Sequence, residues 1–135
     1  MKRSIEVALD SNFLMLPMVK RINLLSELDR LLSAKYRLIV PRCVVDELER
    51  LASHGKPLER RRARFALKLL EEWRAEVVEV PCSAGVDEAL ARGAMSQGWI
   101  VATNDAELRS KLREQGTPVV YLRGGKKLAL EGEVC

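Results

Sequence analysis

The sequence has few of the residues that hold small domains together by covalent or metal links. Its three cysteines, Cys43, Cys82 and Cys135, are scattered, odd in number and without paired spacing. This pattern argues against a disulfide framework and a zinc site, and it fits a reducing compartment. No run of about 18 apolar residues occurs, so we expect no membrane-spanning helix. Glu6 and Asp10 interrupt the apolar start, so we expect no signal peptide and a cytoplasmic location.

Aromatic residues and histidine are also scarce. The chain has two Trp, two Tyr, two Phe and one His. We expect Trp73 and Trp99 in the core, which leaves few aromatic side chains on which nucleobases could stack. The one histidine, His54, is expected in a loop rather than at a catalytic site.

The chain does contain enough apolar residues for one core. Its 135 residues are 47% hydrophobic and 31% charged, with a formal net charge of +4. These values are ordinary for a soluble globular protein, and the positive charge is a weak pointer to a polyanionic partner. We expect a single domain over residues 1–135, with a basic polar tail from about residue 123.

Short apolar runs alternate with helical patterns along the chain. The runs predict strands at Ile5–Leu9, Tyr36–Val40, Val77–Val80, Trp99–Ala102 and Val119–Leu122, with a short edge segment at Lys127–Leu130. Helices are expected at Lys20–Ser33, from Pro41 to about Ala52, and at Val86–Gln97. A longer helix is expected after Pro57, with one face formed by Leu58, Phe65, Ala66, Leu69, Leu70 and Trp73. The last helix is expected to begin at Asn104 as its cap, with Glu107 as the capping-box partner, and to end at Gly116. This order predicts an α/β three-layer sandwich with a central, mostly parallel sheet of four to five strands.

Four acidic residues follow the first four predicted strands. Asp10 comes directly after the first, Glu47 lies in the second turn of the next helix, Asp87 opens the helix after the third strand, and Asp105 lies three residues beyond the fourth. In parallel sheets, ligands bind outside the carboxyl ends of the strands. We therefore expect these four carboxylates at one edge of the sheet.

Helical spacing distinguishes Glu47 from its acidic neighbours. Val44, Glu47, Leu48 and Leu51 recur at the spacing of one helix face, so Glu47 is expected to face the core. The same argument places Asp87 and Asp105 on the interior sides of their helices. An inward carboxylate is costly unless it is paired or bound to metal.

Structural roles compete with a shared site for each acid taken singly. Asp10 and Asp105 could be turn residues or helix caps, and Asp87 a first-turn partner of a helix dipole. Glu47 could form a buried salt bridge with Arg42 or Arg92. Taken together, four converging carboxylates would repel one another, and a hard cation such as Mg²⁺ or Mn²⁺ is their simplest stabilising partner.

A basic segment follows the second predicted helix. It carries Lys56, Arg60, Arg61, Arg62 and Arg64 against the single acid Glu59, and Arg123, Lys126 and Lys127 form a weaker set. The segment could contact an RNA backbone in a salt-sensitive way, or it could be a solvated helix face; both interpretations stay open.

Segments that contain the four acids resemble the successive acidic motifs of PIN-domain nucleases. They are Val7–Leu14, Val44–Leu51, Val86–Leu90 and Ile100–Leu108, in the family's order and over nearly the whole chain. Pro118–Gly125 is also similar to archaeal PIN proteins related to rRNA-processing nucleases. The only mild departure near the first acid is Ser11, where threonine is frequent.

The resemblance implies a Mg²⁺- or Mn²⁺-dependent endoribonuclease that acts on RNA, expected to be single-stranded, and leaves a 5′-phosphate and a 3′-hydroxyl. It implies catalytic and metal-binding roles for Asp10, Glu47, Asp87 and Asp105, with Asn12, Thr103 and Asn104 in support. It connects the protein with rRNA or other RNA processing. Members of the family often form homodimers, and the sequence leaves the oligomeric state open.

Other functions are open to the same sequence. A noncatalytic, RNA-binding PIN-like scaffold and the ribonuclease toxin of a toxin–antitoxin pair would share the fold. Phosphoryl transfer through an aspartyl phosphate fits poorly. A dehalogenase-like phosphatase needs an aspartate where Asn12 stands, and a receiver domain needs one after the third strand, where Val80-Pro81-Cys82 occurs.

Overall fold

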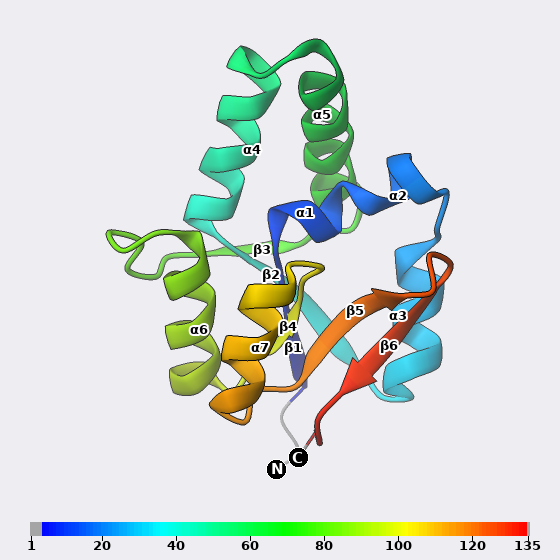
Figure 1. Ribbon diagram of the computed structural model, residues 1–135, viewed down its shortest axis with the longest axis vertical. Coiled ribbons are helices and arrows are strands. Elements are labelled where there is room, and N and C mark those ends of the chain that lie inside the picture. Colours follow the sequence, from blue (N-terminus) through cyan, green and yellow to red (C-terminus); the bar gives the residue numbers. More distant parts are fainter. Residues whose placement is uncertain (1–3, 135) are drawn as a thin grey trace.

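The computed structural model describes residues 4–134, which form one six-stranded sheet in the order β3-β2-β1-β4-β5-β6 (Figure 1). The strands are β1 (Ile5–Leu9), β2 (Tyr36–Pro41), β3 (Glu76–Val78), β4 (Ile100–Ala102), β5 (Val119–Arg123) and β6 (Lys127–Glu131). All neighbouring pairs are parallel except β5 with β6. The predicted class is confirmed, and the segment expected at the edge adds a sixth strand to the four to five predicted.

Seven helices are present in the described residues. They are α1 (Ser11–Leu14), α2 (Leu16–Lys20), α3 (Leu24–Leu32), α4 (Arg42–His54), α5 (Pro57–Glu72), α6 (Val86–Gln97) and α7 (Ala106–Glu114). The helix expected over Lys20–Ser33 begins only at Leu24, because the Asn23 side chain caps it by accepting a hydrogen bond from the Ser26 backbone N–H at 3.0 Å. No helix in this part of the chain is both long and apolar enough to cross a membrane.

The helices cover both faces of the sheet, which confirms the three layers. Val7 and Leu9 of β1 pack in a core with α1, α3, α4 and α5. Ala8, between them, faces the second core against α6 and α7. This alternation is the period of two that a strand imposes on its side chains. Trp99 is buried and Trp73 packs against the larger core, as expected.

Helices α4 and α5 form a hairpin that projects beyond the sheet (Figure 1). The face of α5 that is buried carries Ala63, Ala66 and Leu70. The prediction that Leu58 and Phe65 belong to this face is wrong, since their exposed fractions are 48% and 36%. Small alanine side chains allow α4 and α5 to approach closely, and this shifts the buried stripe.

A disulfide joins Cys43 and Cys82, whose Cα atoms are 6.1 Å apart. The expectation of unlinked cysteines is therefore wrong. The two residues are separated by 39 positions, and they meet because β2 and β3 pair side by side, with Pro41 opposite Val78. The cysteine count thus no longer supports a reducing compartment; intracellular proteins of some hyperthermophiles also contain disulfides.

Candidate active site at the carboxyl edge of the sheet

Asp10 and Thr103 meet where the adjacent parallel strands β1 and β4 end. The Asp10 backbone N–H donates to the Ala102 carbonyl at 3.0 Å. Its Oδ2 accepts a 2.6 Å hydrogen bond from the hydroxyl of Thr103, and this hydroxyl in turn accepts the Asp105 backbone N–H at 3.2 Å. One fully buried hydroxyl therefore connects the two aspartates that follow neighbouring strands.

Asp10 is the buried carboxylate of the group, with an exposed fraction of 4%. Burial raises its pKa to about 6, because a charge is poorly solvated there. Hydrogen bonds from Thr103 and from the Ser11 backbone oppose this shift, and the charges of Asp87 and Glu47 add to it. Asp10 also caps α1, so the predicted capping role is confirmed alongside its place at the edge.

Glu47 projects from α4 toward the start of α1. Its Oε1 accepts a hydrogen bond from the Ser11 hydroxyl. The alternative of a salt bridge with an arginine is wrong: Arg42 pairs with Glu79, and Arg92 pairs with Glu88. Glu47 is half-buried and belongs to the same cluster as Asp10, as its helical phase predicts.

Asp105 is the N-cap of α7. Its Oδ1 accepts the backbone N–H groups of Glu107 at 2.9 Å and Leu108 at 3.1 Å. The prediction that Asn104 caps this helix is wrong, while the capping alternative for Asp105 is confirmed. Its other oxygen, Oδ2, accepts no hydrogen bond from the described residues, so a second partner can bind there.

Asp87 lies in the first turn of α6, next to Glu88. The expectation that it faces the interior is wrong, because its side chain is exposed. Partial burial raises its pKa, and the charges of Asp105 and Glu47 raise it further. It is Glu88 that pairs with Lys111 of α7. Asp87 therefore stands at the rim, within electrostatic reach of the other acids.

Two asparagines connect the loops around these acids. The Asn12 side-chain oxygen accepts the Asn104 backbone N–H at 3.1 Å. The Asn104 side-chain oxygen accepts the Leu122 backbone N–H at 2.8 Å. These bonds join α1, the loop before α7 and strand β5. Sequence reasoning singled out both asparagines, but it missed Ser11 as the donor to Glu47.

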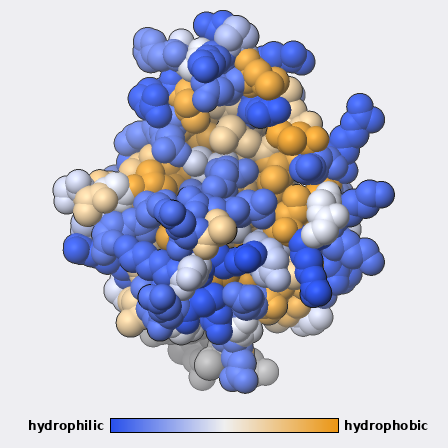
Figure 2. All heavy atoms as spheres, in the orientation of Figure 1, coloured by the Kyte–Doolittle hydropathy of each residue, from blue (hydrophilic) through white to orange (hydrophobic). Residues whose placement is uncertain are grey.

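The basic segment lies at the hairpin tip and along α5. Its members are Lys56, Arg60, Arg61, Arg62 and Arg64, and none forms an ion pair with a residue between 4 and 134. Figure 2 shows hydrophilic side chains gathered at this tip. Arg61, Arg64 and Lys68 recur along one exposed side of the helix. The structure thus leaves these cations free to meet an anion.

The donor set is suited to a hard divalent cation, because it consists of carboxylate oxygens, and the charges of neighbouring acids raise the pKa of Asp10 and of Asp87. As the side chains lie, no three His, Cys, Asp or Glu residues among those described are grouped closely enough to ligate one ion. Mg²⁺ is usually bound by one or two carboxylates and keeps several waters. An open edge with Asp10 and the free oxygen of Asp105 fits this mode.

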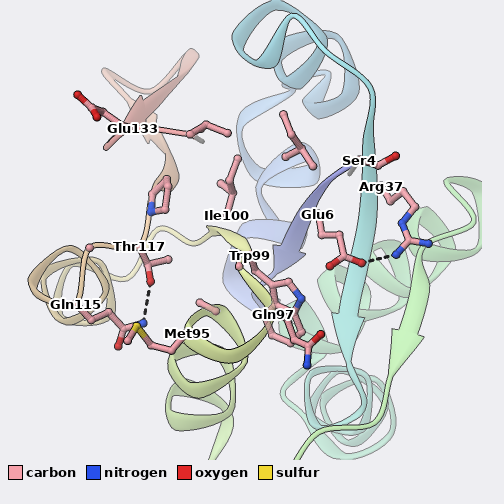
Figure 3. Close-up of a pocket in the computed structure, with 16 residues that line it drawn as sticks. Ser4, Glu6, Arg37, Met95, Gln97, Trp99, Ile100, Gln115, Thr117 and Glu133 are labelled. Atoms are coloured by element: carbon pink, nitrogen blue, oxygen red, sulfur yellow. Dashed lines mark hydrogen bonds and ion pairs between the residues drawn. The ribbon is translucent and has the colours of Figure 1, made fainter. Parts of the chain in front are cut away.

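A cavity of about 680 Å³ lies at the opposite end of the sheet, near the amino ends of the strands (Figure 3). Glu6 pairs with Arg37 on one side of it, and the Gln115 amide donates to the Thr117 hydroxyl at 2.8 Å on the other. None of the four acids lines this cavity. The acidic edge is therefore a separate feature.

The family described as PIN like domain matches residues 7–125. This chain belongs to that family. The PIN domain endonuclease Utp24 has a similar structure, with a TM-score of 0.78 and 28% identity over 96% of this PIN-like chain and 92% of that one.

Two relatives of the PIN-like chain have functional names. Ribonuclease VapC9 of Archaeoglobus fulgidus is 34% identical over 122 residues, which cover 90% of this chain and 86% of VapC9. The rRNA-processing protein FCF1 of Saccharomyces cerevisiae is 29% identical over 124 residues, which cover 88% of this chain and 60% of FCF1. The fold and family expected from the sequence are thereby confirmed, and the relatives include ribonucleases.

Proposed function

We propose that this PIN-like protein is a Mg²⁺- or Mn²⁺-dependent endoribonuclease that hydrolyses RNA phosphodiester bonds at the acidic edge. The observation that carries the proposal is Asp10, a buried carboxylate that is held within reach of the charges of Glu47 and Asp87. Asp10 also caps α1, but a buried carboxylate close to two other negative charges is costly without a cation. Relatives that are named ribonucleases support the same chemistry.

Each acid has a proposed role. Asp10 and the free oxygen of Asp105 hold the cation, and Glu47 and Asp87 complete the shell, hold a second ion or orient the attacking water. Thr103 fixes the Asp10 carboxylate through its hydroxyl, and Asn12 and Asn104 hold the surrounding loops. A bound divalent cation supplies hydroxide near neutral pH by lowering the pKa of water, and it stabilises the developing charge.

The proposed substrate is single-stranded RNA in the cytoplasm, bound mainly through its phosphates. The unpaired cations of α5 and the hairpin tip support this, since phosphate contacts require no sequence reading and few stacking aromatics. Processing of rRNA or another RNA is the proposed setting, in line with the name of FCF1. Formation of a homodimer stays a prediction.

A cleavage assay tests the proposal. The purified protein is expected to cut labelled single-stranded RNA with Mn²⁺ or Mg²⁺ and not with EDTA, and to leave a 5′-phosphate. Asp10→Asn should lower the rate about 100-fold or more, whereas Asp46→Asn, an exposed acid on the same helix as Glu47, should not. RNA binding without metal-dependent cleavage would favour the noncatalytic scaffold instead.

The ribonuclease toxin of a toxin–antitoxin pair is a second candidate with the same chemistry. This candidate is supported by the 34% identity with ribonuclease VapC9, in an alignment that covers 90% of the chain. Expression in a bacterial host distinguishes the two settings: a toxin arrests growth and is relieved by a neighbouring gene, whereas a processing nuclease of restricted specificity does not.

A further inference from the structure

The disulfide connects the two segments that carry Glu47 and Asp87. Cys43 lies in the first turn of α4, four residues before Glu47 and so on the same side of the helix. Cys82 lies in the connection between β3 and α6, five residues before Asp87. One covalent bond therefore links the first turn of α4, which carries Glu47, to the connection that leads to Asp87.

The connection at residues 79–85 has few other attachments. Five of its seven residues are exposed, namely Glu79, Pro81, Ser83, Ala84 and Gly85. Its ties to α4 are the disulfide and a 3.1 Å ion pair between Arg42 and Glu79, and its internal backbone bond runs from the Gly85 N–H to the Cys82 carbonyl. An ion pair between exposed side chains contributes little. Val80 of the connection packs against the second core, but toward α4 the disulfide is the strong link.

The Asp87 carboxylate has fewer direct contacts than the other three acids, so its position depends more on the disulfide. Asp10 and Asp105 are fixed by several hydrogen bonds, and Glu47 accepts the Ser11 hydroxyl. Asp87 accepts no hydrogen bond from the described residues; Val86 before it is partly buried against both cores, and the fully buried positions of α6 begin at Ala89. The position of its carboxylate is set by where the chain enters α6.

We propose that Cys43 and Cys82 are positioning residues whose disulfide holds Asp87 near Glu47, so that its reduction weakens divalent-cation binding at the acidic edge. The inference rests on the proposed function of that edge. In the reduction, a dithiol such as dithiothreitol gives two electrons and two protons to the two sulfurs, the S–S bond breaks to two thiols, and the dithiol closes to a cyclic disulfide.

The test measures Mn²⁺ affinity by calorimetry on the oxidised protein and on protein reduced with dithiothreitol and desalted without oxygen. Thiol counting should give two more thiols after reduction. We expect reduction to weaken Mn²⁺ binding roughly tenfold, with unchanged far-UV circular dichroism. Cys82→Ser should bind weakly in both states, and Cys135→Ser should keep the full difference. If reduction unfolds the protein, the circular dichroism spectrum will change. In that case the Mn²⁺ affinity of the folded Cys43→Ala/Cys82→Ala variant is compared with that of the oxidised protein instead.

The outcomes separate this inference from the function on which it rests. Equal Mn²⁺ affinity of the folded oxidised and reduced proteins would overturn the positioning role and leave the metal site intact. The same result would follow if thiol counting found the two cysteines unlinked while Mn²⁺ bound tightly. Absence of Mn²⁺ binding in both states would overturn the proposed metal-dependent function and this inference with it.

Discussion

Asp10 combines a cost to stability with its proposed role. Its pKa is raised to about 6 by burial and by neighbouring acids, against a usual value of 3.8. In the metal-free protein the folded state therefore prefers the protonated carboxyl. The resulting loss of unfolding free energy is absent below about pH 4, grows as the pH rises from 4 to 6 and is complete above pH 6. A shift of this size corresponds to about 3 kcal/mol.

Asp10→Asn should accordingly stabilise the metal-free protein above pH 6 and have little effect near pH 4. The asparagine oxygen can still accept the Ser11 N–H, and its amide can donate to the Thr103 hydroxyl. The measurement is denaturant unfolding of both proteins in EDTA between pH 4 and 8. A difference in unfolding free energy that does not change with pH would contradict the raised pKa.

Thr103 is expected to be essential for the order of the edge. Its fully buried hydroxyl satisfies Asp10 and the Asp105 backbone at once. Thr103→Val keeps the shape but leaves both groups without this partner, which should cost about 2 kcal/mol of unfolding free energy. Thr103→Ser restores the hydroxyl and should lose less than half as much. Equal losses in thermal unfolding would show that packing of the methyl group, not the hydroxyl, is what matters.

At the level of single residues, the acids could be predicted but not all of their surroundings. Their positions after strands, and the helical phase of Glu47, are local properties of the sequence. The exposure of Asp87 could not be predicted from its spacing. Leu90 and Ala94 are buried as expected, but Asp87 lies in the first turn of α6, directly after an exposed connection. The hydrogen bond from Ser11 to Glu47 joins residues 36 positions apart and has no sequence signal.

Among the elements, helix α5 carries the unpaired cations that we propose to contact RNA. If its unpaired cations contact phosphates, Arg61→Ala/Arg64→Ala should weaken RNA binding and lower the slope of log affinity against log salt by about two. Lys35→Ala is a control, because Lys35 is an exposed cation directly before β2, at the other end of the sheet. Filter binding with uncleaved RNA at several salt concentrations measures both quantities. An unchanged slope in the double variant would make α5 a solvated face.

Elements with strong local signals were predicted well. Strand β1 and helix α6 have their predicted bounds, and Gly98 ends α6 in the left-handed conformation. The α5 face was wrong because Leu58 and Phe65 fit the helical period, yet the partner helix packs on Ala63 and Ala66. Helices α1 and α2 are each too short to produce a periodic pattern.

For the whole molecule, alternating strands and helices were sufficient to predict the layered sheet and the edge at which the acids meet. Parallel strands bring their carboxyl ends to one side whatever the loops do. The pairing of Cys43 with Cys82 depends on β2 and β3 lying side by side, and no spacing rule contains that information. Sequence analysis thus missed contacts, such as this disulfide, that depend on which strands are neighbours in the folded sheet.

The central claim is that the acidic edge formed by Asp10, Glu47, Asp87 and Asp105 binds a divalent cation. Anomalous diffraction from a crystal grown with Mn²⁺ tests it most directly. We predict a peak at the carboxyl edge of the sheet, about 2 Å from oxygens of Asp10 and Asp105 or joined to the other acids through water. A well-ordered edge with no peak in millimolar Mn²⁺, or a peak only elsewhere on the protein, would contradict the account.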